Sequence, residues 1–201
     1  MKRIKVTSKT GQELFLGMPH SLLEYWAWAH SHIVSNSERG ILAEYLVRCA
    51  VHAPSPCRIE WDAVDVISPE GIRIEVKSSA YLQTWKQEKL SRIQFDIAPK
   101  NAWDSVENSY ASQRIRSADV YVFCLFNSKD PDTANPMDLA QWEFYVLATS
   151  VLNELVPKQK SISLTSLQKL GAKKVSFEVL YTAIRLASKE GKNSQGKDID
   201  I

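Results

Sequence analysis

The sequence predicts a single α/β domain in which a central mixed β-sheet is flanked by helices. Three features of the 201-residue chain predict it: two helical patterns near its start, a compact hairpin at residues 61–79, and an almost continuously apolar run at residues 119–126. Such a run is typical of a strand buried on both faces. Helices before and after the strands are then needed to cover the two faces of the sheet.

The first 52 residues are predicted to be mainly helical. Residues 1–19 are ambiguous, and Thr10-Gly11-Gln12 favours a short strand pair there. Residues 21–33 are apolar over most of a helical surface. Asn36 or Ser37 can cap a second helix over about residues 38–52. Its buried stripe comprises Ile41, Leu42, Tyr45, Leu46 and Cys49.

The hairpin joins strands expected at about residues 57–67 and 72–77, with Pro69-Glu70-Gly71 as the turn. Apolar residues alternate along both strands, so one face is apolar. The other face carries Asp65, Glu75 and Lys77, and symmetric pairing puts Asp65 opposite Glu75. Two adjacent carboxylates repel one another unless a cation lies between them. Mg²⁺, which prefers oxygen ligands, fits that place.

The ordered set of Asp65 and then Glu75-Val76-Lys77 resembles the signature of the PD-(D/E)xK nuclease superfamily. The resemblance covers about residues 38–126 and implies a restriction endonuclease-like core with the element order αβββαβ. One departure is Val64, which stands where the motif has proline.

The resemblance implies metal-assisted hydrolysis of a phosphodiester bond. Asp65 and Glu75 would hold Mg²⁺, for which Mn²⁺ can substitute, and the backbone carbonyl of Val76 would be a further ligand. Lys77 would lie beside the attacking water and the phosphate. Its ammonium would stabilise the transition state or, with a pKa lowered by burial, take the proton of the water.

Two further residues are carried over from the resemblance. Glu44, on the helix before the hairpin, would complete the metal shell or position a second ion. Gln83, shortly after the lysine, would orient the water or a phosphate. Each has a plainer alternative: Glu44 can form a surface ion pair with Arg48 at the i+4 position, and Gln83 can be an ordinary surface residue.

Alternatives exist for the hairpin residues as well. Asp65, Glu75 and Lys77 can form a solvated sheet face with a cross-strand ion pair, which contributes at most about 1 kcal/mol. Asp62 is a rival to Asp65 as the strand aspartate. On a regular strand Asp62 points with Val64 to the other face, so Asp65 is preferred.

The remaining pattern extends the sheet and ends in a helix. It predicts, in order, a strand at 93–98, a helical or irregular segment at 101–116, the buried strand at 119–126, a loop at 127–138, a strand at 142–147, a turn of helix near 150–155 and a helix at about 175–189. One domain over residues 1–189 is expected, followed by a polar, disordered tail at 190–201.

Composition limits the classes of function. The net charge of +2 is small for a non-specific nucleic-acid coat protein, so contact with DNA has to come from a local patch. Three widely spaced cysteines predict reduced thiols in a cytoplasmic protein. No membrane contact is expected, because no run of about 18 apolar residues occurs. The histidines, serines and glycines form no zinc, nucleophile-elbow or phosphate-loop motif.

Cations that follow the motif are the candidates for holding DNA phosphates. They are Lys86, Lys89, Arg92, Lys100, Arg114 and Arg116, interleaved with Trp85 and Trp103. A second group, Lys158, Lys160, Lys169, Lys173 and Lys174, is interpreted as ordinary surface charge.

The sequence therefore predicts a Mg²⁺-dependent endonuclease acting on DNA. A non-catalytic nucleic-acid-binding or scaffold protein with the same fold is the main alternative, and hydrolysis of a smaller phosphoester is another. A homodimer would suit cleavage of both strands of a duplex.

Overall fold

The computed structural model describes residues 7–58, 63–104 and 109–195. Its helices are α1 (Leu22–His30), α2 (Asn36–Ala50), α3 (Thr149–Leu155), α4 (Leu164–Lys169) and α5 (Leu180–Gln195), with short 3-10 helices at Leu139–Gln141 and Phe177–Val179. Its strands are β1 (Val66–Ile67), β2 (Arg73–Ala80), β3 (Gln94–Asp96), β4 (Lys100–Asp104), β5 (Ser109–Ile115), β6 (Val120–Phe126), β7 (Trp142–Ala148), β8 (Ser161–Ser163) and β9 (Lys173–Val175). None of the helices in these ranges is long and apolar enough to cross a membrane.

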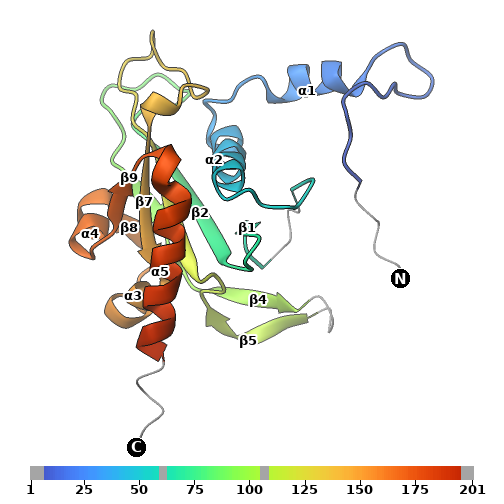
Figure 1. The fold of residues 1–201 in the computed structure, drawn as a ribbon. Helices are drawn as coiled ribbons and strands as arrows, with labels where there is room; N and C mark the ends of the chain where they lie inside the picture. Colours follow the sequence, from blue (N-terminus) through green and yellow to red (C-terminus); the bar gives the residue numbers. More distant parts are fainter. Residues whose placement is uncertain (1–6, 59–62, 105–108, 196–201) are drawn as a thin grey trace, which may run out of the picture.

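Five of the described strands form one mixed sheet in the order β1-β2-β6-β7-β9 (Figure 1). Strands β2 and β6 run parallel, and the other neighbours in this sheet are antiparallel. Two separate ribbons pair β3 with β8 and β4 with β5. The predicted class, a mixed sheet flanked by helices, is confirmed. The crossover from β2 to β6 contains β3 and the β4–β5 ribbon, at the place where the αβββαβ order has a helix.

Strand β6 lies at the centre of the sheet, and all of its residues are buried. Alternate side chains enter two apolar clusters. Val120, Val122, Cys124 and Phe126 pack with residues of α2 and α5 on one face, and Tyr121, Phe123 and Leu125 pack with residues of β3, α3, β8 and α4 on the other. The prediction of a strand buried on both faces is therefore confirmed, and this strand fixes the position of β2 beside it.

Several element boundaries differ from the prediction. The segment 101–116, predicted to be helical or irregular, contains most of the β4–β5 ribbon. The sequence does not indicate this ribbon, because two strands held mainly by backbone hydrogen bonds leave little apolar periodicity. The strand expected at 57–67 comprises only Val66–Ile67 among the described residues. Residues 59–62, and with them the rival Asp62, lie outside those residues.

The C-terminal helix is also displaced relative to the prediction of 175–189. Residues 173–175 pair with β7, a long-range contact that local periodicity does not show. Helix α5 then runs from Leu180 to Gln195, so residues 190–195, predicted to be disordered, are helical, and residues 196–201 lie outside the described residues. Residues 190–195 include several good helix formers, and Glu190 pairs with Lys173 at 3.2 Å.

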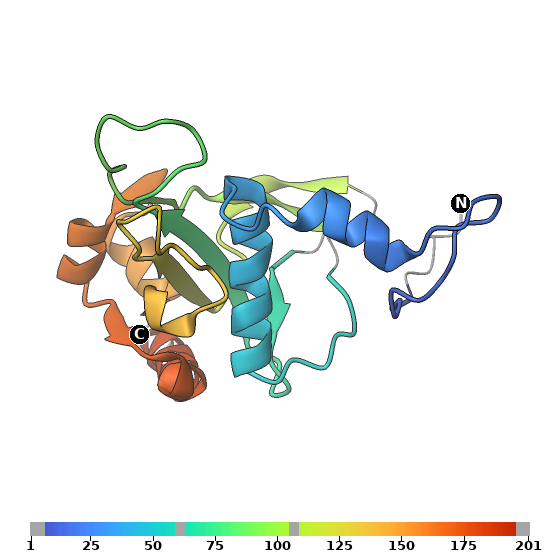
Figure 2. The same ribbon diagram turned by 90° about the horizontal axis from the view of Figure 1, so that it is seen from above.

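Helix α1 begins as its sequence indicates but is not buried. Ser21 and Glu24 form a capping box at its start. None of its residues is buried, and 84% of Trp28 is exposed. Figures 1 and 2 show that residues 7–33 extend away from the sheet. The apolar surface of this helix therefore does not contribute to the core.

Arg116 is a structural residue and not one of the phosphate-binding cations that the sequence predicted. Its side chain is 8% exposed. The guanidinium donates to the carbonyl of Ile97 at 2.8 Å, to Asn153 Oδ1 at 2.9 Å and to the carbonyl of Val156 at 3.1 Å, with longer bonds to other carbonyls around the end of α3. It therefore joins the segment between β3 and β4 to the end of α3 and the loop after it.

Replacing Arg116 by alanine is expected to lower the free energy of unfolding by about 3 kcal/mol, because two buried carbonyls, those of Ile97 and Leu152, and several part-buried acceptors lose their donor. Urea denaturation measures this change. Arg114→Ala, at an exposed position of β5 two residues before Arg116, is the matched control and should change stability by less than about 0.5 kcal/mol. Equal effects of the two substitutions would contradict the structural role.

Candidate active site

The β1–β2 hairpin brings Asp65 and Glu75 together. Gly71 closes the turn at a φ of 80°, a value that favours glycine, and its N–H donates to the carbonyl of Ser68. Val66 lies opposite Ile74. Continuing this register by one residue puts Asp65 opposite Glu75, as the sequence predicts. The N–H of Val76 donates to Asp65 Oδ2 at 2.7 Å and holds the aspartate at the edge of β2.

Glu75 is the centre of the charged cluster. Only 7% of it is exposed. Its Oε1 accepts from Lys77 Nζ at 2.6 Å and from Lys100 Nζ at 2.9 Å. Lys77 is on the same strand two residues later, whereas Lys100 is the first residue of β4 and 25 residues distant in sequence. The structure therefore brings Asp65, Glu75 and Lys77 together as predicted and adds Lys100.

The two carboxyl groups differ in their affinity for protons. Burial, and then the charge of Glu75, raise the pKa of Asp65 to about 6. Burial also opposes ionisation of Glu75, but the ammonium groups of Lys77 and Lys100 outweigh it and hold the pKa of Glu75 below its ordinary value. At neutral pH both groups are ionised, and the charge of Asp65 is the less well compensated of the two.

Asp65→Asn is expected to stabilise the metal-free protein at pH 8 by about 1–2 kcal/mol. A carboxyl group whose pKa is raised on folding favours the folded state while it is protonated, and this contribution is lost as pH rises from about 4 through 6. Asparagine stays neutral and can still accept the Val76 N–H. Urea denaturation with a chelator at pH 8 and at pH 4.5 measures the gain, which should shrink at the lower pH. An equal gain at both pH values would contradict this explanation.

Glu44 lies close to the carboxylates but is engaged by another residue. Its charge contributes to raising the pKa of Asp65, after burial and Glu75. Arg58 forms a two-pronged pair with it, Nε to Oε2 at 2.5 Å and Nη2 to Oε1 at 3.0 Å. Arg48, the expected i+4 partner, instead donates to the carbonyl of Ser55. Glu44 is therefore held by Arg58, a partner 14 residues away that local spacing does not indicate.

Gln83 is not brought to the carboxylates. It follows the far end of β2, where its Nε2 donates to the carbonyl of Ala80 at 3.3 Å. Because a strand rises about 3.3 Å per residue, Ala80 lies roughly 16 Å along β2 from Glu75. The role in orienting water that the resemblance implied for Gln83 is therefore not supported by its position.

The oxygen atoms at the edge of β2 beside Asp65 could serve as ligands of a divalent cation. Asp65 and Glu75 supply two carboxylates, and the ammonium of Lys100 already occupies a place beside them as a cation. In a strand, the N–H and C=O of one residue point to the same side. The Val76 N–H donates to Asp65, so the Val76 carbonyl also faces Asp65, which lies just before β1 in the chain. Within the described ranges, no cluster of three or more His, Cys, Asp or Glu side chains has the geometry of a metal site, so the fit rests on this pair and the carbonyl.

A family model described as bacteriophage T4 endonuclease IV matches residues 17–166. The chain belongs to this family. The matched range contains Glu44, Asp65, Glu75, Lys77 and Lys100 and ends within α4, so α5 lies outside it. No curated protein matches the chain.

Membership of the T4 endonuclease IV family supports the prediction of a nuclease. It agrees with a site built from two carboxylates and lysines, which can hold a metal ion and stabilise negative charge on a phosphodiester. The more specific PD-(D/E)xK assignment and the identity of the metal stay predictions.

The cations that the sequence predicts to bind phosphate do not all lie in one part of the structure. Lys86, Lys89 and Arg92 are exposed on the loop between β2 and β3, together with Trp85, of which 59% is exposed. Arg114 is exposed as well, whereas the side chain of Trp103 lies outside the described residues. In the second lysine group, Lys173 pairs with Glu190 and Lys174 with Glu143, which agrees with ordinary surface charge.

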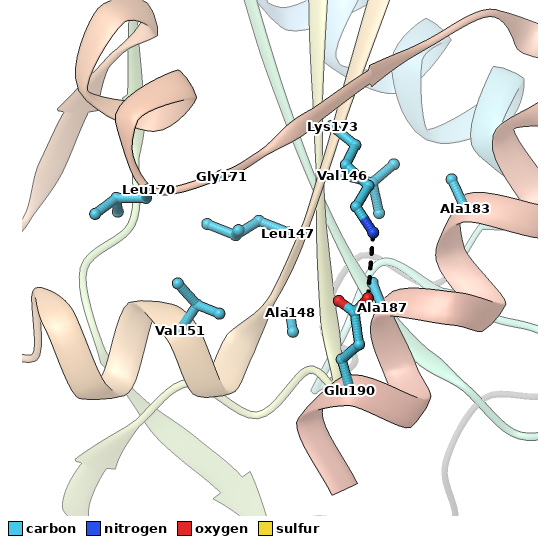
Figure 3. Close-up of a pocket in the computed structure, with 10 residues that line it drawn as sticks. All are labelled: Val146, Leu147, Ala148, Val151, Leu170, Gly171, Lys173, Ala183, Ala187 and Glu190. Carbon is cyan, nitrogen blue, oxygen red and sulfur yellow. Dashed lines mark hydrogen bonds and ion pairs between the residues drawn. The ribbon is translucent and has the colours of Figure 1, made fainter. Parts of the chain in front are cut away.

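A small pocket lies among β7, α3, β9 and α5 (Figure 3). It is lined by Val146, Leu147, Ala148, Val151, Leu170, Gly171, Lys173, Ala183, Ala187 and Glu190. Most of these residues are apolar, and the Lys173–Glu190 pair links β9 to α5. Neither Asp65 nor Glu75 contributes to this pocket, so it is not part of the candidate active site.

Proposed function

We propose that this chain is a Mg²⁺-dependent endonuclease of the PD-(D/E)xK type that hydrolyses phosphodiester bonds in DNA. The observation that carries the proposal is the pairing of Asp65 with Glu75 at the end of the β1–β2 hairpin, with Lys77 bonded to Glu75, in a member of an endonuclease family. A protein that only binds nucleic acid does not need two adjacent carboxylates that repel one another, such as the half-buried Asp65 and the buried Glu75.

Asp65, Glu75 and the Val76 carbonyl would hold the metal. When bound, Mg²⁺ would lower the pKa of a coordinated water and neutralise charge on the phosphate oxygens. Lys77 would donate from its ammonium to the phosphate or to the attacking water. Its 2.6 Å bond to Glu75 and its low exposure fix the ammonium beside the carboxylates before substrate arrives, which limits the reorganisation needed during the reaction.

The polymer proposed as substrate is DNA. The exposed loop with Trp85, Lys86, Lys89 and Arg92 supplies cations for phosphates and a ring for stacking on bases. This local patch is consistent with the small net charge of +2. The homodimer expected for cleavage of both strands stays a prediction, which light scattering can check.

The test is incubation of circular duplex DNA, circular single-stranded DNA and RNA with the full chain in Mg²⁺ or in chelator. We expect metal-dependent cleavage of at least one DNA, and circular substrates establish that the cut is internal. Salt-sensitive DNA binding with no cleavage of any polymer would instead favour a non-catalytic nucleic-acid-binding protein. Cleavage of RNA alone would contradict DNA as the substrate.

A further inference from the structure

Lys100 is the residue of the cluster that neither the motif nor the family description accounts for. Its ammonium bonds Glu75 Oε1 at 2.9 Å, and the same oxygen accepts from Lys77. A lysine side chain is protonated at neutral pH, so Lys100 presents a positive charge to the carboxylate of Glu75.

The two lysines on Glu75 differ in how firmly they are held. The side chain of Lys77 is 16% exposed and comes from the middle of a central pair of strands. That of Lys100 is 60% exposed and comes from the first residue of β4, which pairs with Ile115 at the root of the β4–β5 ribbon. A long, largely exposed lysine can leave the site by rotation of its own side chain, whereas Lys77 has little free space around it.

We propose that Lys100 is an exchangeable counter-ion: together with Lys77 its ammonium neutralises the Asp65–Glu75 pair in the metal-free protein, and a divalent cation displaces the ammonium of Lys100. The inference rests on the proposed function, since it concerns the same carboxylates. It explains how two adjacent carboxylates are accommodated in the absence of a metal. It also implies that binding of the metal frees a lysine next to the position proposed for the phosphate.

Displacement has a measurable consequence, because the metal has to break the Lys100–Glu75 pair before it can bind. Removing the ammonium should therefore tighten metal binding by about fivefold, the change expected from losing a largely exposed ion pair. The substitution Lys100→Met keeps an unbranched side chain, one atom shorter, and removes its charge. Lys158→Met, at an exposed lysine of the second group, controls for the change in net charge.

The experiment is titration of Mn²⁺ into the full chain without DNA, with the free ion followed by electron paramagnetic resonance. We expect wild type and Lys158→Met to bind alike, Lys100→Met to bind about fivefold more tightly, and Glu75→Gln to bind much more weakly. Lys100→Gln should reproduce the gain with a polar side chain. The rise in melting temperature caused by subsaturating Mg²⁺ should likewise be larger for Lys100→Met than for wild type.

The outcomes separate this inference from the proposed function. If Glu75→Gln weakens Mn²⁺ binding but both Lys100 variants bind as wild type does, or more weakly, the counter-ion role is wrong and the metal site stands. If Glu75→Gln binds Mn²⁺ as wild type does, the metal is not held at this edge, and both the inference and the proposed function fail.

Discussion

Replacing Glu75 by glutamine is expected to lower the rate of DNA cleavage by about 10³-fold or more. Glu75 is buried, carries the better compensated negative charge of the pair, and accepts from two ammonium groups. Glutamine preserves its shape but removes the charge that would bind the metal and hold Lys77. The initial rate of cleavage at several Mg²⁺ concentrations measures the loss, which excess Mg²⁺ should only partly restore.

Glu154→Gln is the matched control, because Glu154 is an exposed carboxylate on α3. It should cleave as the wild type does. Circular dichroism and thermal melting establish that Glu75→Gln is folded. A folded Glu75→Gln variant that cleaves within about threefold of the control would show that the chemistry lies elsewhere, since loss of a metal-binding charge costs far more.

Replacing Lys77 by methionine is expected to lower the cleavage rate by about 10²- to 10³-fold while Mn²⁺ affinity is retained or increased. The ammonium of Lys77 has no role as a metal ligand, so its loss affects the phosphate and the water but not the carboxylates that hold the ion. Cleavage rates combined with Mn²⁺ binding therefore distinguish Lys77→Met from Glu75→Gln, which should lose both.

Lys77→Arg separates two roles for this lysine. Arginine keeps the positive charge but stays protonated at any accessible pH. If Lys77 stabilises charge on the phosphate, the arginine variant should retain part of the activity. If Lys77 takes the proton of the water, Lys77→Arg should be as slow as Lys77→Met. Activity of Lys77→Met equal to that of Lys158→Met would contradict both roles.

The sequence predicts the centre of this fold well because local signals decide it. The apolar run at 119–126 is typical of a strand buried on both faces, and β6 confirms it. The turn ending in Gly71 fixes the register of the hairpin, and with it the approach of Asp65 to Glu75. A short, continuously apolar run gives the first signal, and alternation of apolar residues about a glycine turn gives the second.

The remaining features depend on contacts that are distant in sequence. Arg58 reaches Glu44, Lys100 reaches Glu75, and Arg116 reaches the end of α3, and none of these pairs has a spacing that local periodicity detects. The sequence predicts Lys100 and Arg116 alike to be cations for phosphate, because sequence alone does not distinguish a cation at the site from a buried structural one. The position of Gln83 likewise depends on where β2 ends.

The most direct test of the central claim is a single comparison of circular DNA cleavage by wild type in Mg²⁺, wild type in chelator, and folded Glu75→Gln in Mg²⁺. The proposed site predicts cleavage in the first reaction and at most about a thousandth of that rate in the other two. Equal cleavage by wild type and Glu75→Gln, or undiminished cleavage in chelator, would contradict a metal-dependent site at Asp65 and Glu75.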